Sequence, residues 1–275
     1  MTVHRCAASF YRGDLAGLEW SPTVQTHALD LLWTFIRTDF KSRYHGTIGG
    51  FLWALLKPCA MFVVLWTVFS FIFTSDDQYN SNLLIGLFLF DFFGESSKTG
   101  ITSLHAKGYL LTKARFPSWI VVVSSMANAV ITLGIFVVVI TVFLTISSAP
   151  PSALALGLFS FYLLMFLAIV IGFSLGTNVL FLRYRDLNQI WEVIIQAGFF
   201  LAPVVYPLRV MPERYHSFFY LWPPTPVIEF SRSVLVAGVV PSARAHMLLA
   251  LEAACVLVVG ILVFRRYARR AAEHI

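Results

Sequence analysis

Long apolar runs joined by short polar connections make up most of this chain. A helix that crosses the hydrocarbon core of a bilayer needs about 20 predominantly apolar residues. Six runs approach or exceed this length, at residues 51–73, 83–104, 118–146, 154–182, 190–205 and 247–264. The pattern therefore predicts an all-α integral membrane protein with six transmembrane helices per chain, and the even number of spans places both termini on the same side.

Composition agrees with a protein of the bilayer. Of the 275 residues, 58% are hydrophobic and 12% are charged, whereas soluble domains carry roughly a quarter charged residues. The net charge of +6 is compatible with nucleic-acid binding, but the basic residues stand beside the apolar runs and not in a separate domain. We interpret them as topology signals, and expect membrane lipid but no nucleic acid among the partners.

Basic residues near the span ends indicate the orientation. Lys and Arg occur before the first run, in the second and fourth connections and in the C-terminal tail. The first connection, TSDDQYNSN, and the third, SSAPPSA, contain neither. Because Lys and Arg near span ends are retained in the cytoplasm, we expect both termini to be cytoplasmic in a multi-pass protein of the cytoplasmic membrane.

The region before the first span divides into a tail and an amphipathic helix. Residues 1–20 form the tail, and residues 21–45 are predicted to lie in the cytoplasmic interface, with Ser21 and Pro22 as N-cap and first turn. Trp33 belongs to an apolar face, whereas Arg37 and Lys41 belong to the opposite, polar face. This helix is either a membrane anchor or a docking platform for a cytoplasmic partner. Residues 46–275 are the six-span transmembrane domain.

The fifth connection is long and alternates polar turns with apolar pieces that are too short to cross. Such pieces are typical of interfacial or re-entrant segments. We expect two short re-entrant helices on the outer side, at about residues 206–240. The prolines Pro223, Pro224 and Pro226 enforce a break between them, because proline lacks the donor that a continuous helix needs.

Four aromatic residues recur along the first span at intervals of four, three and four residues, which places their rings on one stripe. The stripe can simply pack against another helix or face lipid. The functional alternative is a lane of ring faces along which sugar rings slide. The residues of this predicted channel lane are Phe62, Trp66, Phe69 and Phe73.

The second span carries Asp91, Glu95 and Lys98 on one helical face. Charges inside a span are costly, and they usually face a water-filled cavity or each other. A local pair of Glu95 with Lys98 is the simplest explanation, and a polar stripe along a pore or interface is the functional one. In both cases the face should point away from lipid.

Motifs for catalysis and metal binding do not emerge. GESSKTG at Gly94 lacks the glycine that a phosphate-binding loop places before its lysine, and neither GxSxG nor HExxH occurs. The cysteines Cys6, Cys59 and Cys255 stand far apart, without a metal-ligand spacing. We expect a protein that is not an enzyme and that holds neither a metal nor a cofactor.

Four segments together resemble the permease subunits of ABC exporters for polysaccharides, the O-antigen, capsule and teichoic-acid exporters. They are RYHGTIGGFLWALLKP, LLIGLFLFDFFGESSKTGITSLHAKGYLLTKARFPSW, FLRYRDLNQIWE and PERYHSFFYLWPPTPVIEFSRSVLVAG. The family often has Asn-Pro where this chain has Pro223 and Pro224. The most specific positions of the resemblance are Leu111, Lys113, Phe116 and Pro117, with the pair Arg185 and Asp186.

The resemblance implies a channel made of two copies of this chain, with two separate ATPase subunits on the cytoplasmic side. ATP and magnesium then belong to the ATPase. A coupling helix at about residues 105–117, to which LLTKARFPSW would belong, would transmit the ATPase movement to spans two and three. The ATPase-coupling residues implied in this way are Arg37, Lys41, Lys113, Arg115, Phe116, Pro117, Arg185 and Asp186.

The family's substrate is a glycan linked to polyprenyl diphosphate, which crosses the bacterial inner membrane. We predict that Arg43 and Lys57 contact the diphosphate and that the outer re-entrant helices form a gate. An ABC exporter for a drug or small lipid, and an ion-coupled secondary transporter with Asp91 and Glu95 as proton carriers, remain open as alternatives. The predicted gate residues are Tyr215, Phe218, Phe219, Trp222 and Arg232.

Overall fold

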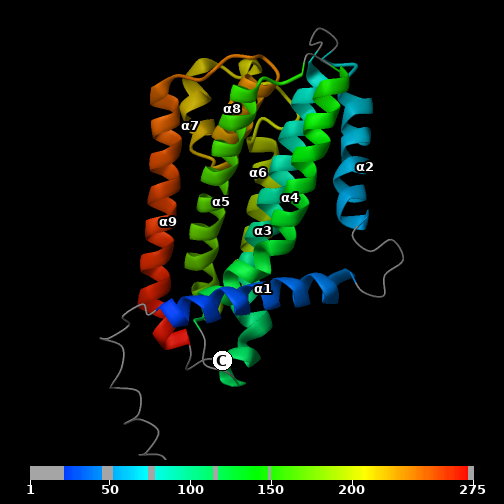
Figure 1. Cartoon of the computed structure of the whole chain (residues 1–275). Helices are drawn as coiled ribbons and strands as arrows, with labels where there is room; N and C mark the ends of the chain where they lie inside the picture. Colours follow the sequence, from blue (N-terminus) through cyan, green and yellow to red (C-terminus); the bar gives the residue numbers. More distant parts are fainter. Residues whose placement is uncertain (1–21, 45–51, 74–77, 114–116, 148–149, 272–275) are drawn as a thin grey trace, which may run out of the picture.

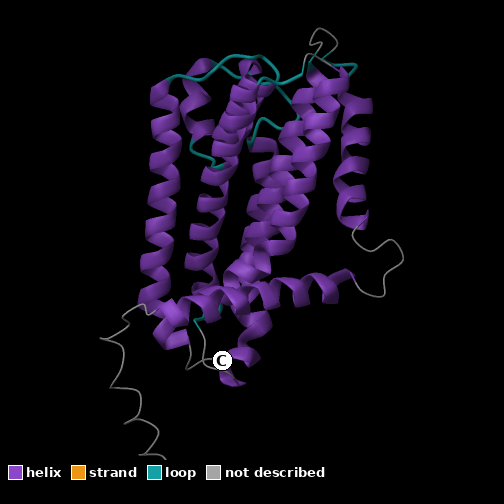
Figure 2. Cartoon of the chain, in the orientation of Figure 1, coloured by secondary structure: helices purple, strands orange, loops and turns teal. Residues whose placement is uncertain are grey.

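The computed structural model describes residues 22–44, 52–73, 78–113, 117–147 and 150–271. This part of the chain is entirely helical outside its loops (Figure 2). It forms nine α-helices and two short 3₁₀ turns, which confirms the all-α prediction. The helices are α1 (Pro22–Tyr44), α2 (Leu52–Phe69), α3 (Tyr79–Lys113), α4 (Trp119–Ser147), α5 (Ala153–Phe181), α6 (Leu187–Leu201), α7 (His216–Tyr220), α8 (Pro224–Leu235) and α9 (Ala243–Ala271), with 3₁₀ turns at Leu208–Val210 and Glu213–Tyr215.

The long helices run side by side as a bundle, and α1 lies across one end of it (Figure 1). Helices α7 and α8 lie at the opposite end. Four helices within the described residues are long and apolar enough to cross a membrane, namely α2, α4, α5 and α9. The chain is therefore an integral membrane helical protein, as its composition predicts.

The other two predicted spans depart from this simple pattern. Helix α3 has 35 residues but carries Asp91, Glu95 and Lys98 within its length. Helix α6 has 15 residues, which at 1.5 Å per residue gives about 22 Å, less than the roughly 30 Å hydrocarbon core. The structure thus supports four spans by length and composition, and the count of six stays a prediction.

Close backbone approach fixes α9 against α5, the pair of helices with the most extensive contact in the bundle. A Cβ added at Gly260 would overlap the main chain of Gly172, with the Gly172 Cα only 2.9 Å away. A Cβ at Gly172 would in turn lie 2.7 Å from the Leu257 nitrogen. Small residues at a crossing let two membrane helices approach closely, so these glycines set the spacing of α5 and α9.

The segment 105–113 belongs to the predicted coupling helix, and it is helical in the structure. These residues form the last turns of α3, which continues without interruption from Tyr79 to Lys113. Residues 114–116 lie outside the described part, and Pro117 is exposed just before α4. The cytoplasmic end predicted for coupling is thus a direct extension of the second predicted span.

The predicted break at the prolines is present between two short helices. Helix α7 ends at Tyr220, and α8 begins at Pro224 with Pro223 as its N-cap residue. Proline is well suited to the first turn of a helix, where its missing N–H has no intrahelical partner. Most of α8 is buried against α3 and α5, so this connection is packed into the bundle and not laid over its surface.

Candidate functional site

An open pocket of about 760 Å³ lies between α2, α3 and α6. The charged face of α3 lines it, with Asp91, Glu95 and Lys98, and Lys57 of α2 lines it as well. The structure therefore brings the predicted polar stripe together with one of the two predicted diphosphate contacts. Most of the remaining wall is apolar, and includes Met61, Val64, Leu87, Phe90, Phe199 and Phe200.

Lys98 pairs with a residue that the sequence did not single out. Its Nζ lies 3.6 Å from Oε1 of Glu192 on α6. Both side chains are partly exposed, at 36% and 45%, so this pair is worth at most about 1 kcal/mol. It links α3 to α6 beside the pocket, and it identifies Glu192, within the quoted segment FLRYRDLNQIWE, as a further charged residue next to this site.

An aromatic cluster between α3, α5 and α6 lies near this pocket. Trp191 of α6 lies 4.3 Å from Phe173 between ring centroids, and its Nε1 donates a hydrogen bond to Ser97 Oγ at 2.9 Å. Trp222, from the turn between α7 and α8, contacts the rings of Phe93 and Trp191 at 5.7 and 6.2 Å. The tip of the outer connection is therefore inserted between α3 and α6.

Gly198 makes this insertion sterically feasible. A Cβ at that position would overlap the Trp222 ring, with Cε2 at 2.9 Å. Of the other predicted gate residues, Phe219 is buried, whereas Tyr215 and Phe218 are 47% and 60% exposed. The predicted gate residues thus range from the buried core to the surface.

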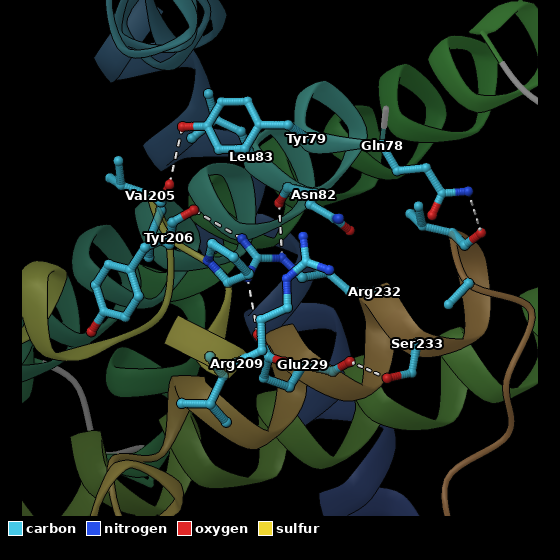
Figure 3. Close-up of a pocket in the computed structure, with 15 residues that line it drawn as sticks. Gln78, Tyr79, Asn82, Leu83, Val205, Tyr206, Arg209, Glu229, Arg232 and Ser233 are labelled. Carbon is cyan, nitrogen blue, oxygen red and sulfur yellow. Dashed lines mark hydrogen bonds and ion pairs between the residues drawn. The ribbon is translucent and has the colours of Figure 1, made fainter. Parts of the chain in front are cut away.

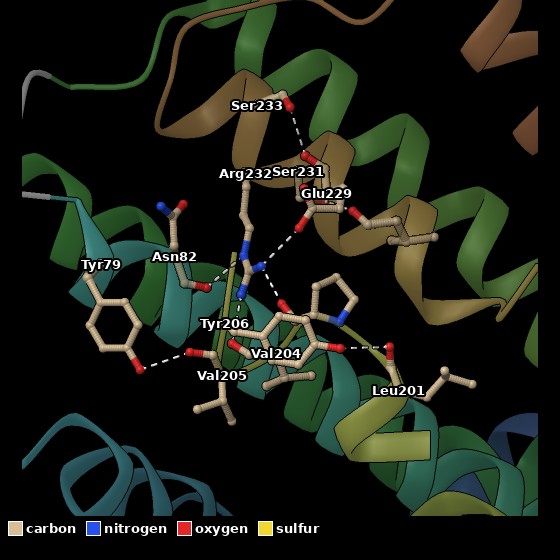
Figure 4. Close-up of polar contacts among 12 residues, drawn as sticks. Tyr79, Asn82, Leu201, Val204, Val205, Tyr206, Glu229, Ser231, Arg232 and Ser233 are labelled. Atoms are coloured by element: carbon tan, nitrogen blue, oxygen red, sulfur yellow. Dashed lines mark hydrogen bonds and ion pairs between the residues drawn. The ribbon is translucent and has the colours of Figure 1, made fainter. Parts of the chain in front are cut away.

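Arg232, also a predicted gate residue, joins α3, the segment after α6 and helix α8 (Figure 4). Its Nε donates to the Asn82 carbonyl of α3 at 2.9 Å, and its Nη2 donates to the Val204 carbonyl after α6 at 2.8 Å. Its Nη1 donates to the Pro203 carbonyl and, at 3.0 Å, to Oε1 of Glu229. A guanidinium with several fixed donors is suited to hold such a junction together.

The fit of Arg232 requires a small residue on α3. A Cβ at Gly86 would overlap the guanidinium. Nearby, Tyr79 donates a hydrogen bond from its hydroxyl to the Val205 carbonyl at 3.0 Å. The start of α3, the end of α6 and helix α8 are therefore tied by side chains from both α3 and α8.

The predicted aromatic lane lies partly against the chain itself. Phe62 contacts Phe143 of α4 edge to face at 6.3 Å, and Phe73 stacks on Tyr79 at 5.2 Å. Phe69 is also packed against the hydrophobic core, whereas Trp66 is 42% exposed. These contacts favour helix packing for three rings, and leave Trp66 as the ring most available to a substrate.

Several of the predicted coupling residues lie at the surface of the structure. Arg37 and Lys41 are exposed on α1, and Arg185 and Asp186 are exposed in the turn before α6. The side chains of Arg43 and Lys113, together with residues Arg115 and Phe116, lie outside the described part of the structure.

Helix α1 is fastened to the bundle by a charged pair that the sequence analysis missed. Lys107 of α3 forms an ion pair with Asp39 of α1. Residues Leu32, Ile36 and Phe40 are half-buried on the same side of α1, whereas Trp33, predicted for the apolar face, is 66% exposed. The half-buried face therefore packs on the bundle, and Trp33 is free to contact lipid.

Comparison with known proteins defines the class of this membrane protein. Residues 30–236 match the ABC-2 type transporter family. Because this match covers most of the chain, the protein belongs to that family. It is a membrane permease, the transport subunit of a transporter, and it carries no catalytic domain of its own. ABC-2 permeases generally pair with ATPase subunits.

The individual relatives have low sequence identity to this chain, but each comparison covers most of both proteins. An O-antigen export system permease protein RfbA of Klebsiella pneumoniae is 23% identical over 90% of this chain and 95% of its own length. RfbA of Myxococcus xanthus is 26% identical over 67% of this chain and 71% of its own length. The polysialic acid transport protein KpsM of Escherichia coli is 21% identical over 84% and 90%.

Proposed function

We propose that this chain is the channel-forming permease of an ATP-driven exporter that moves a polyprenyl-diphosphate-linked polysaccharide across the bacterial inner membrane. Two copies of the chain and two ATPase subunits would form the complete exporter. Family membership and the O-antigen and polysialic acid relatives support the substrate class. Each chain contributes six spans, with α3 and α6 as the second and fifth, and both termini lie in the cytoplasm.

The pocket between α2, α3 and α6 carries this proposal. A lipid-linked glycan has a hydrocarbon chain, a charged diphosphate and a polar sugar chain, and it needs a site that offers apolar and charged surface together. The pocket has apolar walls beside Lys57 and the charged face of α3. Charged residues within membrane helices commonly mark substrate pathways, which suits passage of a polar chain along α3.

Lys57 is the basic group that this pocket offers most directly. It is exposed and forms no ion pair within the described part of the chain, whereas Lys98 is engaged by Glu192. An ammonium group is a suitable ligand for a phosphate oxygen. Lys57 therefore contacts the diphosphate in our proposal, with Arg43 as the second basic residue.

Substitution of Lys57 tests the substrate site. Lys57→Ala should reduce the amount of glycan at the cell surface at unchanged permease level in the membrane, whereas Lys57→Arg keeps the charge and should retain most of the export. Equal export by all three proteins would contradict a role of this residue in diphosphate binding.

Co-purification tests the assembly. Tagged permease is purified in mild detergent, and the eluate is assayed for ATPase activity in the wild type and in a Lys113→Glu, Arg115→Glu double variant. A matched control with Arg265→Glu and Arg266→Glu makes the same charge change at exposed positions near the end of α9. Activity lost only in the first variant supports coupling through LLTKARFPSW, and absence of any ATPase would contradict the exporter proposal.

A further inference from the structure

A second pocket, of about 260 Å³, lies at the outer end of the chain beside the Arg232 junction (Figure 3). Its wall comes from the start of α3, the segment after α6 and helix α8. Ligand sites for drug-sized molecules have volumes of about 300–1,000 Å³, so this pocket suits a smaller unit. It is separate in position from the larger pocket between α2, α3 and α6, since the two share no lining residue.

Carboxamide groups give this pocket both donors and acceptors. Gln78 and Asn82 are one helical turn apart and line the same wall. The main-chain carbonyl of Asn82 accepts from Arg232, but its side-chain amide forms no hydrogen bond within the described residues. An amide offers two N–H donors and a carbonyl acceptor, so the Asn82 side chain is available to a ligand that both donates and accepts.

The charges around the pocket do not favour a small ion. Glu229 is paired with Arg232 through Oε1 at 3.0 Å, so its carboxylate is compensated and gives no site for a cation. The Arg232 guanidinium donates to three main-chain carbonyls besides this carboxylate, and its donors are therefore not directed at an anion. A neutral polar ligand fits this arrangement better than a charged one.

Two tyrosines add ring surface to the same wall. The hydroxyl of Tyr79 donates to the Val205 carbonyl at 3.0 Å, and that of Tyr206 donates to the Phe200 carbonyl at 2.9 Å. Their polar groups are thus used inside the protein. The half-buried Tyr206 supplies most of the apolar ring surface, because Tyr79 is only 5% exposed and stacks on Phe73. Ring faces beside amide groups match a molecule with hydroxyl groups at its edge and C–H groups on its face.

We infer that this outer pocket binds a single neutral sugar ring of the glycan as the chain leaves the permease. The inference rests on the proposed function, because that function places a polyhydroxylated chain at this end of the molecule. Asn82 is the central hydrogen-bonding residue of the site, and the half-buried ring of Tyr206 contacts the apolar face of the sugar. The site lies against the Arg232 junction, so an emerging sugar contacts the predicted gate directly.

Cysteine labelling from outside the cell tests this site. In a full-length background with Cys6, Cys59 and Cys255 replaced by alanine, Ser233→Cys places a reporter in the pocket wall, where the native hydroxyl bonds only locally to the Glu229 carbonyl. Val239→Cys, at a 61% exposed position after α8, serves as the control. The probe is a sulfonated methanethiosulfonate reagent, which does not cross the membrane, applied to cells with and without glycan synthesis.

Glycan synthesis should slow labelling at residue 233 and leave labelling at residue 239 unchanged. A pocket occupied for nine tenths of the time would slow the reaction about tenfold. Adding Asn82→Ala should remove this protection, because the free amide is lost while the main-chain carbonyl that Arg232 uses is kept. Equal labelling rates with and without glycan at residue 233, or equal protection at both positions, would overturn the inference.

Failure of the proposed function would give a different result. Surface carbohydrate would then be unchanged when the gene for this chain is deleted, whatever the labelling rates. If surface carbohydrate depends on the chain but residue 233 is not protected, the exporter proposal stands and the sugar site is refuted.

Discussion

Replacement of Arg232 by methionine tests how strongly α3, the segment after α6 and helix α8 are held together. The change removes every hydrogen-bond donor of a side chain that is 9% exposed. The carbonyls of Pro203 and Val204 and the Glu229 carboxylate then lose the guanidinium as their partner. The Asn82 carbonyl loses less, because it lies within α3 and keeps a helical partner. A buried polar group that loses its partner costs about 1–3 kcal/mol.

The expected loss of unfolding free energy follows from these groups. Breaking a buried charge pair by removing one partner typically costs about 3–5 kcal/mol. Because the adjoining pocket of about 260 Å³ lets water reach part of the junction, we expect the lower end of that range, about 3 kcal/mol. Arg232→Lys keeps the charge but has no fork of donors, so it should recover only part of the loss.

The measurement is unfolding of the purified permease in mixed micelles, followed by tryptophan fluorescence. Trp222 stands just before α8, the helix that carries Arg232, and its ring contacts Trp191, which makes this signal sensitive to the region. A companion variant, Arg244→Met, removes an exposed arginine at the start of α9 and should change stability much less. A loss below about 1 kcal/mol for Arg232→Met would refute the reasoning, because water would then have replaced the guanidinium.

Three further changes have defined outcomes. Gly260→Ala should force α9 away from α5 and lower the unfolding free energy by about 1–3 kcal/mol, whereas the same stability as the wild type would contradict a tight crossing. Trp191→Phe should keep the ring contacts but lose the hydrogen bond to Ser97, a cost of about 1 kcal/mol in the same unfolding assay. Asp39→Lys should repel Lys107, detach α1 and increase the protease sensitivity of α1. Adding Lys107→Asp exchanges the two charges and should restore protection from the protease. If protection is not restored, the result would argue against the ion pair.

The sequence predicts the helices well because their signals are local. The third predicted span, 118–146, corresponds to α4 (Trp119–Ser147), and the fourth, 154–182, corresponds to α5 (Ala153–Phe181). The break before Pro224 is equally local, since it follows from the chemistry of one residue type. The continuation of α3 to Lys113 was not predicted, because the polar residues that follow the apolar run end the hydropathy signal but not the helix.

The side-chain contacts that join the helices could not be predicted from the sequence. Arg232 binds main-chain carbonyls far away in the chain, and a carbonyl carries no residue-specific signal. The pair of Lys98 with Glu192 likewise depends on how α3 and α6 are placed. Arg232 could be proposed for the gate from its position, but its acceptors emerge only when the fold brings three segments together.

Helix α3 runs without interruption from Tyr79 to Lys113, so a tilt of this helix displaces both of its ends. Its 35 residues span about 52 Å, so a rotation of about 5° around its middle moves each end by about 2 Å. Hydrogen bonds of 2.9 and 3.0 Å, such as those from Arg232 to the Asn82 carbonyl and from Tyr79 to the Val205 carbonyl, do not survive such a displacement. A small tilt imposed near Lys107 would thus break the hydrogen bonds at the Tyr79 end of α3, while the overall outline of the bundle hardly changes. Spin-label distances between the two ends of α3 and a fixed point on α5 would measure this tilt directly.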